Sequence, residues 1–392
     1  MRSAMALLLA SVAFSASAPL QPPAGWAAVA RDYRGALQRA GVVGSSLMLL
    51  QNGRVLAREN AGLQDSSSGR PIDDDTIYHW ASITKTFTGI AIMQLRDRGL
   101  LSLDDPAVKY VPELRLAHDP YGPIEDVKIR YLMSHSAGFR AATWPWGGDQ
   151  PWQPFEPTRW QQIVAMMPYT ELQFGPGTRY SYSNPGVIFL GRIIEQLTGD
   201  DYEMYVTKNI LMPLGMRSSF FDRAPYYLLP NRSHSYFRDD HGVREGRFDF
   251  DTGITVSNGG LNAPFGDMAK YIAFLQGDAT NRADYDIVLK RASLEEMWAP
   301  QISAREGEGT NGADSHAALS FFVERYGDIE LIGHSGDQNG FISHLYLNRA
   351  SGFAWLISMN TDVTATPDRP GSRQVDAAVR DSMIRNVLAR EK

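Results

Sequence analysis

The chain has 392 residues, of which 43% are hydrophobic and 21% are charged, values that are ordinary for a globular protein with a sizeable core. Its net charge of −6, with no basic stripe, argues against a nucleic-acid partner. The sequence contains no cysteine, which excludes disulfides, thiolate catalysis and cysteine-based metal sites.

Residues 1–18 have the pattern of a secretory signal peptide. Arg2 precedes a short apolar run, and the pair Ala16-x-Ala18 follows it. The run is shorter than the ~20 apolar residues that a membrane anchor would need, and no later segment is long and apolar enough to span a bilayer. We therefore expect an exported protein, periplasmic or secreted, whose mature domain covers residues 19–392.

The two ends of the chain both predict β-strands with a flanking helix. Two strand-like runs on either side of Asn52-Gly53 indicate a hairpin. Helical spacing is found at 25–40 and 374–390, and further β-rich runs are found at 317–325, 329–334, 341–348 and 353–359. The simplest assembly is one antiparallel sheet that is built from both chain ends and flanked by the terminal helices.

The middle of the chain is mostly helical and rich in loops, and includes helical patterns at 185–199 and 264–276. Strand runs at the ends with helices between them predict the α+β class rather than alternating βαβ units. We expect a sheet lobe from about 25–80 and 310–392, with an inserted helical lobe at about 100–300. The stretch 144–160 holds four tryptophans and four prolines, so it is either a loop that covers the core or a wall of a substrate pocket.

The stretch ASITKTFTG, residues 81–89, places Ser82 and Lys85 three residues apart at the start of a buried helix. Residues at this spacing share one helix face. A lysine amine in a desolvated pocket can take the proton of a serine, which is otherwise a poor nucleophile. Ser-x-x-Lys occurs by chance about once in a chain of this size, so a capping serine beside a solvated lysine is the alternative interpretation.

Two later stretches support the catalytic interpretation. Tyr182-Ser183-Asn184 lies in a turn-rich segment that we expect to form a loop before a helix at 187–198. The tyrosine can shuttle a proton, and Asn184 can hydrogen-bond a substrate amide or carbonyl. The second stretch is His334-Ser335-Gly336 at the junction of two predicted strands, where the glycine permits close approach of a substrate. The backbone N–H of Asp337 could join that of Ser82 as an oxyanion donor.

With these three motifs in this order, the sequence resembles the serine β-lactamase and penicillin-binding-protein superfamily, in particular its class C and esterase-like branch. The resemblance covers nearly all of the mature chain and includes LMSHSAGF (132–139), MPLGM (212–216) and GGLNAPFGDMAKY (259–271). It implies a sheet domain joined to a helical domain, with the site between them.

The resemblance also implies a role for each residue. Ser82 would be the acylated nucleophile, Lys85 its proton partner and Tyr182 the base for acylation, which would also help to protonate the leaving group or activate the deacylating water. Asn184, His334, Ser335 and Gly336 would bind substrate. His334 stands where many members of the superfamily have a lysine, and an imidazole is largely neutral at pH 7. The substitution is typical of esterase-like members and lowers the expectation of efficient β-lactam hydrolysis.

No metal or other cofactor is predicted, because the eight histidines show no metal-binding spacing and no glycine-rich phosphate loop precedes a helix. His135, in the motif SHSAGF, is interpreted as a structural residue that supports the site. The leading hypothesis is a serine hydrolase that acts on a small-molecule or peptide ester or amide, with esterase activity slightly favoured. The first alternative is a β-lactamase or a penicillin-recognising D-amino-acid peptidase near the cell wall. The second is a non-catalytic protein that uses the same scaffold for binding or assembly.

Overall fold

The computed structural model describes residues 21–145, 157–277, 282–304 and 314–390. The predicted signal peptide and most of the tryptophan-rich stretch lie outside these ranges. Within them, no helix has the length and apolar character needed to cross a membrane.

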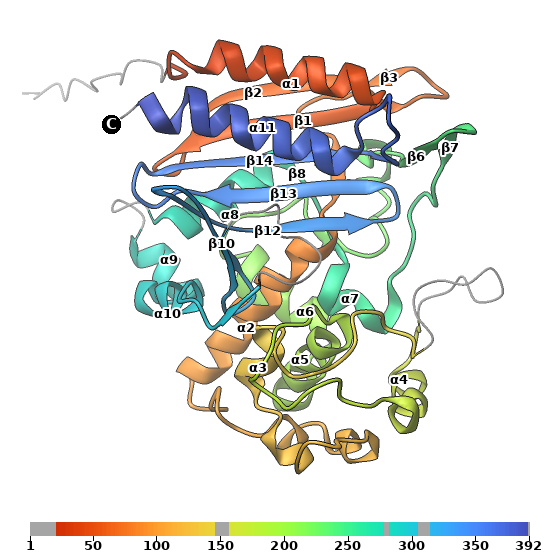
Figure 1. Cartoon of the computed structure of the whole chain (residues 1–392), viewed down its shortest axis with the longest axis vertical. Helices are drawn as coiled ribbons and strands as arrows, with labels where there is room; N and C mark the ends of the chain where they lie inside the picture. The colour runs from red at the N-terminus through yellow and green to blue at the C-terminus, as the bar shows by residue number, and fades with distance from the viewer. Residues whose placement is uncertain (1–20, 146–156, 278–281, 305–313, 391–392) are drawn as a thin grey trace, which may run out of the picture.

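A nine-stranded antiparallel sheet, built from both ends of the chain, forms the centre of the molecule (Figure 1). Its strands follow the spatial order β3-β2-β1-β14-β13-β12-β11-β10-β9. Their bounds are β1 (Gly44–Gln51), β2 (Arg54–Asp65), β3 (Arg70–Pro71), β9 (Ile302–Ser303), β10 (Asp314–Ala317), β11 (Phe322–Tyr326), β12 (Ile329–Gln338), β13 (Phe341–Leu347) and β14 (Phe353–Met359). The predicted α+β class and the predicted assembly of the sheet from both ends are confirmed.

Local turn chemistry sets two of the connections in this sheet. Asn52 and Gly53 both have positive φ angles, 48° and 79°, which is the geometry of the tight hairpin turn that the sequence predicts. The expected single run at 317–325 is wrong, because the chain turns back between β10 and β11. Ser320 adopts a φ of 62° there, and the N–H of Ala318 donates to the carbonyl of Phe321.

One face of the sheet is covered by the two terminal helices, α1 (Trp26–Ala40) and α11 (Ser372–Asn386), which lie side by side across it (Figure 1). Leu47, Leu49 and Trp355 point from the sheet into this layer and are completely buried. The apolar spacing of both helices is therefore explained by a single shared interface with the sheet.

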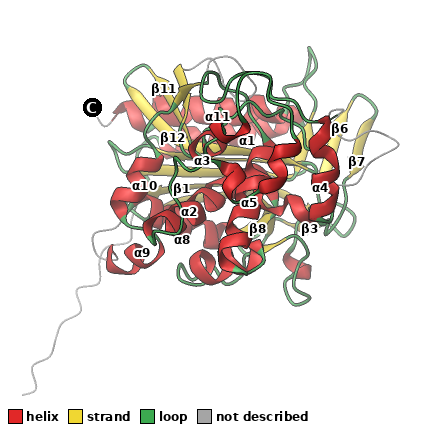
Figure 2. Cartoon of the chain, turned by 90° about the horizontal axis from the view of Figure 1, so that it is seen from below, coloured by secondary structure: helices red, strands yellow, loops and turns green. Residues whose placement is uncertain are grey.

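The opposite face carries the larger core and the helical lobe. Its helices are α2 (Thr84–Asp97), α3 (Ile129–Met133), α4 (Trp160–Met166), α5 (Asn184–Thr198), α6 (Tyr202–Val206), α7 (Val256–Gly259), α8 (Phe265–Gln276), α9 (Arg282–Val288) and α10 (Arg291–Met297). Viewed from the helical side, α2, α3 and α5 lie in front of the sheet (Figure 2). Every residue of α2 from Thr84 to Leu95 is buried, which confirms the predicted deeply buried helix.

The described residues include six further short strands, four of them in the middle of the chain. They form two three-stranded sheets, one of β4 (Ile77–His79), β8 (Leu261–Pro264) and β5 (Phe220–Phe221), the other of β15 (Thr361–Val363), β6 (Tyr236–Asp239) and β7 (Gly242–Glu245). Because β4 pairs with β8 and leads directly to Ala81, the first of these sheets fixes where α2 begins.

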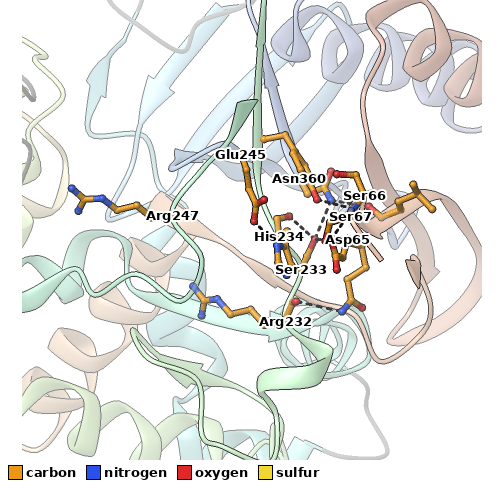
Figure 3. A network of polar contacts seen from close by, with 12 residues as sticks. Asp65, Ser66, Ser67, Arg232, Ser233, His234, Glu245, Arg247 and Asn360 are labelled. Carbon is orange, nitrogen blue, oxygen red and sulfur yellow. Dashed lines mark hydrogen bonds and ion pairs between the residues drawn. The ribbon is translucent and has the colours of Figure 1, made fainter. Parts of the chain in front are cut away.

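A polar network fastens the β6–β7 hairpin to the central sheet (Figure 3). Asn360, completely buried at the end of β14, donates from Nδ2 to the carbonyl of Leu63 at 2.9 Å and to Ser233 Oγ at 3.0 Å. His234, the next residue, contacts Glu245 through Nδ1 at 2.5 Å. One amide side chain thus joins three segments that are far apart in the sequence.

We expect Asn360→Ala to lower the free energy of unfolding by about 2 kcal/mol, because it leaves the part-buried carbonyl of Leu63 without its side-chain donor. Urea denaturation followed by circular dichroism measures the change. Gln38→Ala, an exposed amide on α1, is the control and should shift stability by less than about 0.5 kcal/mol. Equal midpoints for the two variants would contradict the role of Asn360.

Candidate active site

Ser82 lies in a short 3₁₀ turn, Ala81–Ile83, between β4 and α2. The preceding Ala81 has a φ of 47°, a left-handed conformation that costs a residue with a Cβ about 1 kcal/mol or more. The surroundings hold this geometry: the backbone N–H of Trp80 donates to the carbonyl of Leu261, and its indole N–H donates to that of Ala263. The strained turn leaves Ser82 partly exposed at the end of a buried helix.

The amine of Lys85 is completely buried beside this serine. Its Nζ lies 2.9 Å from Ser82 Oγ and donates to the backbone carbonyl of Asn258 at 2.7 Å. Burial lowers the pKa of Lys85 well below the ordinary lysine value. Within the described ranges no acidic side chain forms an ion pair with Lys85, so nothing offsets the cost of burying its charge. A neutral Lys85 has a lone pair that can take the proton of Ser82.

Tyr182 and Asn184 come from the start of α5. The helix begins at Asn184 rather than at residue 187, because Ser183 caps it by accepting the N–H of Gly186 at 3.1 Å. The ring of Tyr182 faces Lys85, with Nζ 5.1 Å from the ring centre. Asn184 Oδ1 is buried and has no hydrogen-bond partner among the described side chains and backbone.

His135 supports Tyr182 from behind. Its ring stacks on that of Tyr182 at 4.3 Å, and its Nδ1 accepts the backbone N–H of Ser183 at 3.1 Å. Burial, together with the positive charge of a protonated Lys85, holds the pKa of His135 well below its usual range, so the ring is neutral. Its backbone is left-handed, with a φ of 54°. The geometry agrees with the supporting role expected for this residue.

β12 forms the other wall of the site. A Cβ on Gly336 would lie 2.3 Å from the carbonyl oxygen of Trp80, so only glycine lets this strand approach the turn that carries Ser82. His334 is 2% exposed, and its Nδ1 donates to the carbonyl of Ser335 at 2.6 Å. Burial, and next the charge that Lys85 carries when it is protonated, lower the pKa of His334 to about 3. The ring is therefore neutral, and its Nε2 is an acceptor with no partner in the described part of the chain.

An open cavity of about 590 Å³ brings the predicted residues together. Seven of them line it: Ser82, Tyr182, Asn184, His334, Ser335, Gly336 and Asp337. Lys85 lies behind Ser82 and contacts it. The pairing of the Ser82 and Asp337 N–H groups as an oxyanion hole stays a prediction, as do the individual catalytic roles.

Other parts of the site were not predicted. The carbonyl of Asn258 holds Lys85, and Phe322 lines the cavity with its ring 5.2 Å from that of His334. A backbone carbonyl has no signal in a sequence, whereas an aromatic residue at the start of a strand has one that is too common to interpret. In the described residues, no three histidine, aspartate or glutamate side chains are grouped as a metal ion would require.

Comparisons with known proteins show what the chain resembles. The family model described as "Beta-lactamase" matches residues 29–380. Protein flp of Staphylococcus aureus strain COL is 30% identical over 331 residues, which are 84% of this chain and 62% of that protein. Esterase EstB of Burkholderia gladioli is 30% identical over 198 residues, 48% of this chain and 50% of the esterase. The chain therefore spans less than two thirds of the length of the curated relatives that it matches.

A solved structure shows the same fold. That of D-amino acid amidase from Ochrobactrum anthropi SV3, complexed with L-phenylalanine, superposes with a TM-score of 0.74 at 21% identity. The match covers 93% of this chain and 99% of the amidase.

The burial of Lys85 predicts a pH dependence. A lysine whose pKa is lowered loses its proton at a lower pH than usual, so kcat/KM for an ester should rise with pH through that pKa, below the ordinary range near ~10.4. In Lys85→Ala this rising limb should disappear, and the rate should fall by on the order of 10²–10⁴. Stopped-flow or initial-rate profiles across pH measure both effects.

Lys208→Ala is the matched control, because Lys208 is a half-exposed lysine paired with Asp200 away from the cavity. It should keep both the wild-type rate and the rise of kcat/KM with pH. If kcat/KM of Lys85→Ala still rises with pH as in the wild type, Lys85 is ruled out as the titrating base.

Proposed function

This chain belongs to the β-lactamase family of serine hydrolases, and we propose that it cleaves an ester or amide bond through a covalent acyl-enzyme on Ser82. The observation that carries the proposal is the contact between the buried amine of Lys85 and Ser82 Oγ in the wall of an open cavity. The name of one relative, an esterase, and that of a structural neighbour, an amidase, support the same two bond types.

In the acylation step, neutral Lys85 takes the proton of Ser82, directly or through Tyr182, as Oγ attacks the substrate carbonyl. The carbonyl oxygen becomes negatively charged, and the backbone N–H groups of Ser82 and Asp337 are the proposed donors to it. The bond to the leaving group then breaks, and the leaving alcohol or amine receives the proton that the serine lost.

In the second step, water adds to the acyl carbonyl and gives its proton to the same base. The bond to Oγ breaks, and Ser82 regains its proton. Tyr182 is the proposed relay in both directions, because its ring faces the amine of Lys85 and is supported by stacking on His135.

His334 supports an ester preference over β-lactams. A lysine at this position would present an ammonium to the carboxylate of a penicillin. Neutral His334 presents an acceptor lone pair at Nε2, which attracts a hydrogen-bond donor and offers nothing to an anion. The alternative function, a β-lactamase or a D-amino-acid peptidase, requires an anion-binding group that this position does not supply.

We expect the purified protein to hydrolyse a short p-nitrophenyl ester with a higher kcat/KM than a chromogenic cephalosporin. Ser82→Ala should abolish ester turnover, by about 10⁶-fold for the loss of a nucleophile. It should also abolish the mass increase that a fluorophosphonate produces on the wild-type protein. Ser335→Ala, which alters another serine of the same cavity, is the control and should still give the adduct.

Two results would overturn the proposal in different ways. Faster turnover of the cephalosporin than of the ester would favour the β-lactamase alternative. No adduct and no turnover with any ester, amide or lactam would favour a non-catalytic binding or assembly protein.

We also propose that the protein is exported, on the pattern of residues 1–18. Expression in a bacterial host should give a periplasmic or secreted chain whose intact mass lacks this segment. Leu8→Arg, which interrupts the apolar run, should retain the full-length chain in the cytoplasm. An uncleaved wild-type chain in the cytoplasm would contradict export.

A further inference from the structure

The cavity that contains Ser82 continues past the edge of β12 to the opposite face of the sheet. β12 pairs with β11 only as far as Gly333, and of the described strands only β13 pairs with residues 334–338. These residues are therefore a free edge around which the cavity passes. Its lining includes Tyr182 on the catalytic side and Asp376 of α11 on the other.

Strand register shows which side chains lie behind this edge. Cross-strand partners share a face of a sheet, and Ser335 is paired with His344. His344 is next to Tyr346 on the same face, and their rings stack at 3.7 Å. We call this region the outer compartment, and its cavity-lining residues are Glu324, Ser335, His344, Tyr346, Arg373 and Asp376.

Two buried carboxylates dominate the charge of the outer compartment. Glu324 is 6% exposed and Asp376 is 7% exposed. Asp376 lies 2.7 Å from the imidazole of His344, which is a counter-charge only when it is protonated. Arg373 pairs with Asp337 at 2.8 Å, which leaves that pair neutral. Arg380 pairs with the more exposed Asp381 at 2.9 Å.

In the described part of the chain, one oxygen of each carboxylate has a hydrogen-bond donor. Glu324 accepts the hydroxyl of Tyr326 at 2.8 Å through Oε2. Asp376 Oδ2 contacts His344 Nδ1 at 2.7 Å and accepts the hydroxyl of Tyr346 at 3.0 Å. Asp376 Oδ1 is buried and has no partner in the described residues. Buried carboxylates normally have their hydrogen bonds or counter-charges satisfied, so this arrangement is costly unless something completes it.

Tyr346 is a hydrogen-bond donor to this cluster. Burial first, and then the charges of Asp376 and Glu324, raise the pKa of Tyr346 well above its usual value. The phenol therefore stays protonated and donates its hydrogen bond to Asp376. The stacked ring of His344 is likewise held with Nδ1 toward Asp376.

We propose that the outer compartment binds a protonated amine of the substrate, and that Glu324 and Asp376 are its ligands. The inference rests on the proposed hydrolase function and narrows it to esters or amides whose acyl or leaving group carries a cationic amine. The uncharged part of such a substrate crosses the free edge of β12, while the reacting carbonyl remains beside Ser82.

The test uses pairs of p-nitrophenyl esters that differ only in charge. In each pair the acyl chain ends in a dimethylammonium group or in an isopropyl group of the same shape, and the pairs differ in chain length. At the chain length that reaches from Ser82 to the outer compartment, kcat/KM of the wild type should be higher for the dimethylammonium ester than for the isopropyl ester by on the order of tenfold to a hundredfold. Glu324→Gln and Asp376→Asn should each reduce this ratio toward unity.

Glu330→Gln is the matched control, because Glu330 is a carboxylate of β12 that pairs with Arg325 and does not line the cavity. It should keep the wild-type ratio. No preference for the cation at any chain length would overturn the proposal. A preference that survives in both Glu324→Gln and Asp376→Asn would also overturn it, because the cation would then bind elsewhere.

A binding measurement separates this inference from the proposed function. Dimethylalkylammonium salts should raise the Tm of the wild type more than that of Glu324→Gln or Asp376→Asn, whether or not any ester is cleaved. If no ester is hydrolysed and no fluorophosphonate adduct forms, but this shift is present, the hydrolase proposal fails and the amine site stands. Equal shifts in all three proteins would refute the amine site.

Discussion

The buried amine of Lys85 is the interaction on which the rest of the site depends. An ammonium in this position would have to be stripped of water, and no carboxylate of the described residues forms an ion pair with it, so the neutral form is favoured. That preference turns an ordinary serine into a candidate nucleophile, since the amine can accept a proton only when it lacks one. The carbonyl of Asn258 accepts one N–H of Lys85 and leaves the lone pair for Ser82. The depth of α2 in the core maintains this environment.

The same burial explains why the site lies between the central sheet and the helices that pack on it. α2 is enclosed by the helical lobe, but the turn before it has to approach β12 so that Ser82 reaches the cavity. Gly336 permits this approach, because any side chain there would collide with the backbone of Trp80. The free edge of β12 then remains open beside the nucleophile, and an extended substrate can lie along it. The packing of α2 thus keeps Lys85 neutral, and the packing of the turn against β12 leaves an open strand edge beside Ser82.

Sequence patterns predicted the parts of this arrangement that are set by residues close together in the chain. Asn52-Gly53 specified its hairpin, and Ser82 with Lys85 specified a helix face, because turn geometry and helical spacing are properties of neighbouring residues. α5 begins at Asn184 and not at the predicted residue 187, because Ser183 caps it by accepting the N–H of Gly186. The short strands of the middle segment were missed because two to four residues show no alternation. The outer compartment could not be predicted at all, since Glu324 and Asp376 meet only through strand and helix packing.

The acidic side chains lie away from the catalytic residues because Lys85 has to stay neutral to act as a base. A carboxylate in contact with its amine would stabilise the ammonium, raise its pKa and remove the base. Recognition of a cationic substrate by acidic groups therefore conflicts with catalysis if both occur on the same face of the sheet. Here His135 and His334 are neutral around the nucleophile, whereas the two buried carboxylates lie behind β12. The sheet keeps the acids away from Lys85, and its free edge still lets one substrate reach both.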